Sequence, residues 1–300
     1  MYEAACAGVK ARTSECEHGG VDTVASGKDP RRDGRDRPRS GGRGHRGDRQ
    51  PGRTPQRGGR QRGSEPSDPE RRSAEQAAYD GPPIPEQVTG RELDRAVAAQ
   101  LRGLPEKLAA RVARHLVAAA LLMDEDPATA YRHASAARAR AARIAVVREA
   151  CGEAAYAAGE YTEALSELRA AKRMNGSNDY LPVMADCERA LGRPDKALEL
   201  AHSPAVASLG EAEQAEMTIV ESGARLDRGE IDAALRTLET APLRSRSRAP
   251  WVARLRYAYA EALLAAGRGA DALEWFHRTV AVDGEQATDA AERAAELEQG

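Results

Sequence analysis

The seven residues Gly159-Glu160-Tyr161-Thr162-Glu163-Ala164-Leu165 decide the fold of this chain, because their pattern recurs along it. The pattern is a turn residue, an alanine five positions later, and an apolar residue directly after that alanine. Its other copies are Gly192-Ala197-Leu198, Gly229-Ala234-Leu235 and Gly267-Ala272-Leu273, and a copy without the glycine is Glu125-Ala130-Tyr131. The turn residues are 34, 33, 37 and 38 positions apart, and periods of this length predict a repeat architecture.

Each copy predicts a helical hairpin. A glycine closes the first helix in the left-handed conformation, and the chain then turns into a second, antiparallel helix. The alanine falls in the first turns of that second helix, where its small side chain lets the two backbones approach closely. Because one hairpin cannot bury its own apolar face, several must stack. Alanine is abundant, and no segment alternates with a period of two, so we expect an all-α body.

Small residues recur at two further offsets from the turn. Seven positions before it stand Ala118, Gly152, Ala185, Ser222 and Ala260, and twelve positions after it stand Ala137, Ala171, Pro204, Ala241 and Thr279. This spacing resembles the tetratricopeptide repeat (TPR) family over about residues 108–282. The resemblance implies an α-solenoid of about five TPR-like hairpins. Leu181–Arg189 and Tyr131–Ala134, with an arginine-rich leader, also resemble a group of actinobacterial TPR proteins, which implies no activity.

The sequence departs from the regular repeat at several points. Pro204 predicts that the second helix of the third hairpin is short. Glu221 and Arg225 stand where apolar residues are usual in the family, so we expect weaker packing in the fourth hairpin. At the flanks, the capping box Thr89–Glu92 predicts the start of a helix. Glu285–Glu298 predicts one last helix, which caps the C-terminal end of the solenoid.

Composition divides the chain into a tail with a linker, residues 1–88, and a helical repeat domain, residues 89–300. From Pro30 to Gly63 twelve arginines and three aspartates leave a net charge of +9, without one aliphatic side chain, whereas residues 64–300 carry −9. Such a segment cannot offset the entropy of ordering, about 1–2 kcal/mol per residue, so we expect a disordered tail. The chain shows no signal-peptide core and no apolar run of membrane-spanning length, which predicts a cytoplasmic protein.

The resemblance to TPR proteins implies a binding face. In that family the first helices line a concave surface that binds peptides. The corresponding residues here are Glu149, Glu153, Tyr156, Asp179, Asp186, Arg189, Arg254, Tyr257 and Glu261. Their acidic bias predicts a protein or peptide partner with a basic segment. An ordinary solvated helix face is an equally open interpretation. The family's carboxylate-clamp variety needs a set of several lysines, arginines and asparagines in the groove, which this face lacks, so chaperone C-terminal tails are not expected ligands.

The tail suggests a second function. Its arginines are Arg31, Arg32, Arg35, Arg37, Arg39, Arg43, Arg46, Arg49, Arg53, Arg57, Arg60 and Arg62. Guanidinium groups suit phosphates, so the alternative is a nucleic-acid-associated protein that binds RNA or ribosomes through this tail. Without aromatic residues for base stacking, such binding should be sequence-independent and steeply salt-dependent. A purely solubilising tail, and a tail that folds back onto the acidic face, also remain open.

Nothing in the sequence predicts catalysis. It contains no phosphate-binding G-x-x-x-x-G-K-[ST] loop, no H-E-x-x-H pair and no G-x-S-x-G elbow. His115 and His133 fall on the two helices of the first hairpin, where a packing role outweighs a ligand role. Cys6, Cys16 and His18 have a poor spacing for zinc, and we expect all cysteines to be free thiols. The prediction is a non-catalytic interaction scaffold or adaptor without cofactor or metal.

Overall fold

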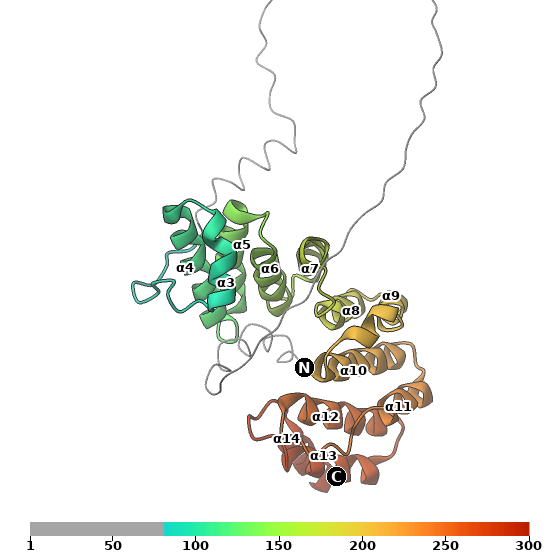
Figure 1. Cartoon of the computed structure of the whole chain (residues 1–300). Coiled ribbons are helices and arrows are strands. Elements are labelled where there is room, and N and C mark those ends of the chain that lie inside the picture. The colour runs from blue at the N-terminus through green and yellow to red at the C-terminus, as the bar shows by residue number, and fades with distance from the viewer. Residues whose placement is uncertain (1–80, 300) are drawn as a thin grey trace, which may run out of the picture. The chain divides into compact units, whose positions relative to one another are not determined.

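The computed structural model describes residues 81–299, which all belong to one compact unit (Figure 1). Within these residues there are twelve α-helices, two short 3-10 helices and no strand, which confirms the all-α prediction for this part of the chain. The elements are α3 (Arg95–Gln100), η1 (Leu101–Gly103), α4 (Glu106–Leu122), α5 (Pro127–Ala141), α6 (Ala145–Ala157), α7 (Tyr161–Asn175), α8 (Leu181–Ala190), α9 (Pro194–Ala201), η2 (Pro204–Ser208), α10 (Glu211–Asp227), α11 (Ile231–Glu239), α12 (Pro250–Ala265), α13 (Gly269–Val280) and α14 (Ala290–Gln299).

The helices pack in consecutive pairs, and four of the pairs are joined at the predicted glycines. The pairs are α4–α5, α6–α7, α8–α9, α10–α11 and α12–α13. The left-handed glycines are Gly159 (φ 78°), Gly192 (φ 71°), Gly229 (φ 76°) and Gly267 (φ 73°). After each glycine the next amide donates to the carbonyl five residues earlier, as from Glu160 to Ala155 at 2.8 Å. Since two packed helices joined by a few residues must run in opposite directions, each pair is a hairpin.

The first hairpin replaces the glycine with a polar cap. Asp126 precedes α5, and its carboxylate accepts a hydrogen bond from the Thr129 amide at 3.0 Å. Pro127 occupies the first helical position, where the missing amide hydrogen is tolerated. This explains why the copy with Glu125 keeps the hairpin without a glycine.

The alanines of the repeat are sealed from solvent. Ala130, Ala164, Ala197, Ala234 and Ala272 each have a relative exposure of 0%. The small position of the first helix is equally tight: a Cβ added to Gly152 would lie 2.7 Å from Leu168 of α7. Both small positions therefore mark close contact between paired helices, as the sequence predicted.

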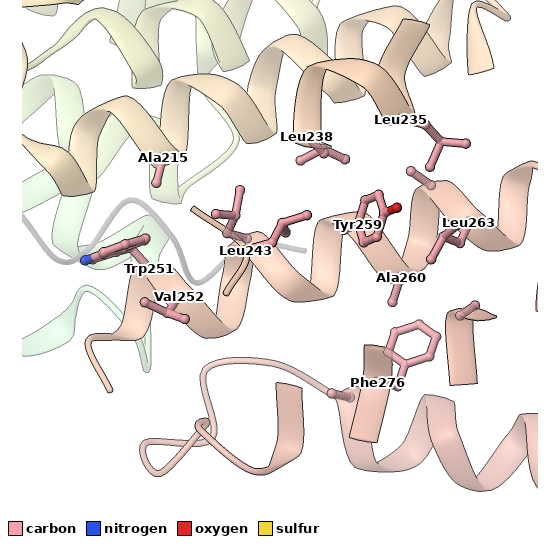
Figure 2. Close-up of a cluster of buried hydrophobic side chains, with 14 of the residues drawn as sticks. Ala215, Leu235, Leu238, Leu243, Trp251, Val252, Tyr259, Ala260, Leu263 and Phe276 are labelled. Atoms are coloured by element: carbon pink, nitrogen blue, oxygen red, sulfur yellow. The ribbon is translucent and has the colours of Figure 1, made fainter. Parts of the chain in front are cut away.

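The apolar core continues from each hairpin to the next. Helices α6, α7 and α8 share one buried cluster around Leu168 and Met184. Helices α8, α9 and α10 share another, which includes Met217. A third joins α10 to α14, and Figure 2 shows Trp251 of α12 near Ala215 of α10 and Phe276 of α13 near Ala260. Successive hairpins are thus held together by apolar packing.

The third and fourth hairpins are the irregular ones. The short second helix predicted from Pro204 is confirmed, because α9 ends at Ala201 and the exposed Pro204 begins η2. The weaker packing expected for the fourth hairpin stays a prediction. Glu221 and Arg225 pair with each other at 2.8 Å, while Met217 on the same helix is buried.

Two helix starts differ from the predictions. Glu92 accepts a hydrogen bond from the Thr89 amide at 3.2 Å, but α3 begins only at Arg95, where Asp94 caps it. The last helix begins at Ala290 rather than near Glu285. The preceding turn is held by Asp283, whose carboxylate accepts hydrogen bonds from the amides of residues 287 and 288. Asp94 thus caps α3 directly, whereas Asp283 holds the turn that delays the start of α14.

Residues 81–88, which the sequence analysis assigned to the linker, contact the first hairpin. Val88 is 2% exposed and packs against Val117 and Ala118 of α4. The guanidinium of Arg114 donates to the Val88 carbonyl at 2.8 Å.

The alanine contacts make a direct stability prediction. Ala130→Leu should lower the free energy of unfolding by about 1–3 kcal/mol, because the closed α4–α5 contact has no room for the added carbons. Ala128→Leu is the matched control on the same helix, since Ala128 is exposed, and it should change stability by less than about 0.5 kcal/mol. Urea unfolding followed by circular dichroism measures both. Equal effects of the two substitutions would refute the packing role.

Candidate functional site

From α6 onward, polar side chains join the first helix of a hairpin to the helix that begins the next unit. Between α6 and α8, the Tyr156 hydroxyl donates to Asp186 at 2.5 Å. Tyr180, directly before α8, donates to Glu149 of α6 at 2.8 Å and accepts from Asn175 at 2.7 Å. Burial raises the pKa of both tyrosines, and the neighbouring carboxylates raise it further, so both hydroxyls remain protonated donors.

Arg189 continues the connection from α8 to α10. Its guanidinium lies 3.1 Å from Asp186 on its own helix and 2.7 Å from Asp227 on α10. It rests against Gly223, where an added Cβ would lie only 2.7 Å from the central guanidinium carbon. The absence of a side chain at Gly223 therefore gives Arg189 its path to Asp227.

The connection extends through α12 to α14. Arg254 of α12 binds Glu216 of α10 with its Nε at 2.7 Å and a terminal nitrogen at 2.5 Å. Burial raises the pKa of Glu216, and Arg254 opposes that rise. Arg293 of α14 donates to Glu261 of α12 at 2.8 Å. Tyr257 of α12 hydrogen-bonds Asp289, which directly precedes α14.

We call this set the first-helix network. Its members are Glu149, Tyr156, Tyr180, Asp186, Arg189, Glu216, Asp227, Arg254, Tyr257, Glu261, Asp289 and Arg293. Between α10 and α14 two of its carboxylates each face an arginine. Between α6 and α10 the carboxylates outnumber the single arginine, Arg189. The network therefore has its larger excess of carboxylates between α6 and α10.

The structure brings most of the predicted face residues into this network, but not all of them. Tyr156, Asp186 and Arg189 form one connected group, and Arg254, Tyr257 and Glu261 belong to the α12 part. Asp179 lies apart: it is exposed in the turn before α8 and accepts a hydrogen bond from Ser177 at 2.7 Å. Glu149 and Glu153 are buried, at 7% and 9% exposure, rather than open to solvent.

Several network members were missed by the sequence analysis. Glu216 could have been found, because it stands 13 positions before its turn glycine, as Asp179 and Arg254 do. Asp289 and Arg293 fall after the last repeat, where the register no longer applies. The tail arginines, Cys6, Cys16 and His18 lie outside the described residues. Cys151 and Cys187 are buried thiols, and burial raises their pKa to about 11 and about 12, so they are poor nucleophiles.

The two histidines of the first hairpin form a buried pair. His115 and His133 are each 1% exposed, with their Nδ1 atoms 3.0 Å apart. Burial, His133 and the guanidinium groups of Arg111, Arg140 and Arg114 lower the pKa of His115 to about 4. Burial likewise lowers the pKa of His133. Both rings are therefore neutral at pH 7, and one Nδ1 donates to the other.

No protein-family model matches the chain, and no curated protein matches it. Across residues 81–299, no helix is both long and apolar enough to cross a bilayer. The same residues hold no group of three or more histidines, cysteines or carboxylates arranged to bind a metal ion. The candidate site thus rests on the network geometry.

The histidine pair predicts an acid-sensitive fold. An unfolded histidine takes up a proton near its ordinary pKa of 6.5, but folded His115 does so only near 4. The unfolded state therefore holds more protons between these values, and stability should fall by on the order of 2 kcal/mol as the pH drops from 6.5 to 4. Urea unfolding across this range measures the slope. His115→Gln should flatten it, whereas His277→Gln, at an exposed position, should not; an unchanged slope in His115→Gln would contradict the assignment.

The contact of Arg189 with Gly223 predicts that adding a methyl group at position 223 removes the interaction energy between Arg189 and Asp227. A double-mutant cycle with Arg189→Ala and Asp227→Ala should give a coupling energy of about 0.5–1 kcal/mol. In a Gly223→Ala background this coupling should fall to near zero, because the new Cβ displaces the guanidinium. The Arg293–Glu261 coupling serves as the control and should persist. Persistence of the Arg189–Asp227 coupling in that background would show that Gly223 does not position the arginine.

Proposed function

We propose that the chain is a non-catalytic interaction scaffold of the TPR type, whose five hairpins stack into an α-solenoid and bind a protein partner on the concave face of their first helices. The observation that carries the proposal is the first-helix network. Its hydrogen bonds and ion pairs join α6, α8, α10, α12 and α14 in order.

The stacked arrangement is supported by the way the cores are shared. Each hairpin contributes buried residues to a cluster with the next, and α10 contacts both α8 and α12. A repeat protein in which each unit contacts only its neighbours is built in this way. The buried alanine in every hairpin fits the TPR spacing that the sequence resembles.

A binding role is supported by the chemistry of the face. Partly buried ion pairs give no more stability than apolar side chains of similar volume, so the first-helix network is not the most stabilising way to hold these helices together. It does supply fixed donors and acceptors. Asp186 and Arg189 keep side-chain exposures of 25% and 24%, so a partner can reach groups that are already oriented. Fixing side chains before binding lowers the entropy that association must offset.

The excess of carboxylates between α6 and α10 favours a partner with a basic segment. A lysine or arginine of the partner would compete with Arg189 for Asp186 and Asp227. Such an exchange keeps every carboxylate paired, and it avoids the cost of a buried charge without a counter-ion. The half-exposed carboxylate of Asp227, with 39% side-chain exposure, is the most accessible entry point of this group.

Neutralising the face should weaken partner binding. The face variant carries Asp186→Asn, Asp227→Asn and Glu261→Gln, which keep side-chain size and remove three negative charges. Proteins captured by the full wild-type chain from a lysate of its source cells would be identified, purified and titrated by calorimetry. We expect the face variant to bind the purified partner at least ~10-fold more weakly, since each charged hydrogen bond contributes about 1.5 kcal/mol or more.

The control variant removes the same charge from second helices. Glu163, Glu199 and Asp232 are exposed on α7, α9 and α11, and their amide replacements should leave affinity unchanged. Circular dichroism establishes that both variants are folded, and Asp186→Asn alone serves if the triple change unfolds the protein. Retained binding in the face variant, with loss in the control variant, would reject the proposed face.

A further inference from the structure

The loop between α11 and α12 carries a separate concentration of positive charge. It contains Arg244-Ser245-Arg246-Ser247-Arg248, three arginines within five residues, and no carboxylate occurs from residue 240 to residue 250. All three arginines are exposed. None of them forms a hydrogen bond or ion pair through its side chain with any described residue.

In this lack of partners the loop arginines differ from the arginines on the surrounding helices. Arginines that face a neighbouring helix, such as Arg189, Arg254 and Arg293, pair with carboxylates. Like charges held in one short segment repel each other, and no anion of the described chain relieves that repulsion. The loop therefore presents three unused guanidinium groups to an external anion.

The backbone that carries these arginines is well anchored. Leu243 is 8% exposed and belongs to the apolar cluster of α10–α14, where Figure 2 shows it beside α12. Arg256 of α12 donates to the carbonyls of Leu243 at 2.9 Å, Ser245 at 2.8 Å and Arg278 at 3.0 Å. The Ser245 hydroxyl also accepts from the Ser247 amide at 3.2 Å.

Positive charge extends behind the loop. Burial lowers the pKa of Arg256, and the positive charge of the nearby Arg278 lowers it further. The first turn of α12 contains no acidic residue, and no side chain caps its N-terminus. Its amide dipoles therefore add to the positive potential after Arg248 instead of being neutralised.

We propose that Arg244, Arg246 and Arg248 form a nucleic-acid-binding loop that contacts the phosphate backbone without reading sequence. A guanidinium fork pairs with phosphate oxygens in a bidentate manner, and closely spaced arginines suit a polymer with regularly repeated phosphates. The loop belongs to the described residues, and none of its three arginines is a member of the first-helix network.

The surroundings of the loop favour nucleic acid over other anionic partners. A membrane surface is disfavoured because the loop exposes no large apolar side chain for insertion, since Leu243 is buried. A single phosphorylated side chain would engage one or two guanidinium groups and leave the rest unpaired. Trp275 does not offer a stacking platform, because Arg278 lies over its ring at 4.6 Å, so base recognition is not expected.

The test compares two variants of the full chain that lose the same charge. The loop variant carries Arg244→Ser, Arg246→Ser and Arg248→Ser. The control variant carries Arg173→Ser, Lys196→Ser and Arg236→Ser, which are exposed positions without side-chain partners on α7, α9 and α11. Both variants keep the tail, so any difference between them belongs to the loop. Fluorescence anisotropy with labelled unstructured 20-nucleotide RNA, single-stranded DNA and duplex DNA measures affinity across a salt series.

We expect the loop variant to bind RNA and single-stranded DNA at least ~10-fold more weakly at about 100 mM salt, with the slope of log affinity against log salt reduced by about 2. The control variant should keep the wild-type slope. Ultraviolet cross-linking with 4-thiouridine RNA should place cross-links on the peptide that contains residues 244–248. Equal affinities and slopes for the two variants would overturn the proposal. So would a loop-dependent affinity for anionic-lipid vesicles or for a phosphoserine peptide that exceeds the affinity for RNA.

Discussion

The close contact of two helices at a buried alanine determines the rest of this structure. In every hairpin from α4 to α13 the alanine five positions after the turn has no exposed surface. With only a methyl group at the contact, the paired helices approach until their apolar neighbours interlock. That spacing also fixes where the following hairpin begins. Asp186 of α8 and Asp227 of α10 bind Tyr156 and Arg189, which lie on the first helix of the preceding hairpin.

The arrangement separates two kinds of contact between neighbouring hairpins. Apolar clusters supply the non-directional attraction, and arginines supply directional links. Glu188 is 2% exposed and is bound by Arg169 at 2.5 Å and Arg193 at 2.6 Å, while Glu167 is bound by Arg138 and Arg148. A carboxylate buried in this way would be costly without its cations. The pairs therefore specify which helix faces meet, and the apolar clusters provide most of the free energy.

The sequence predicted those parts of the fold that depend on local, periodic features. The turn glycines, the buried alanines and the short α9 all follow from residues close together in the chain. The network was only partly predictable, because register gives the helix face of a residue but not its partner. Arg189 reaches Asp227 across 38 residues, and its path depends on Gly223, a position that pattern alone marks as merely small. The start of α3 was misplaced because Asp94 caps it in place of the Thr89–Glu92 capping box, and the start of α14 because Asp283 holds residues 287 and 288 in a turn.

The two proposed binding surfaces use arginine in different ways and would therefore differ in their mode of recognition. In the first-helix network each guanidinium already has a carboxylate partner, so a binding partner must replace an existing ion pair with a new one. The net binding free energy is then small for most ligands and large only for a ligand whose geometry matches. This favours specificity over a high association rate. In the α11–α12 loop the guanidinium groups have no partner to lose. Any polyanion can form ion pairs with them without first breaking existing ones, and salt ions compete directly for the same charges. The paired surface therefore suits selection of one partner, whereas the unpaired loop suits contact with a repetitive, interchangeable one.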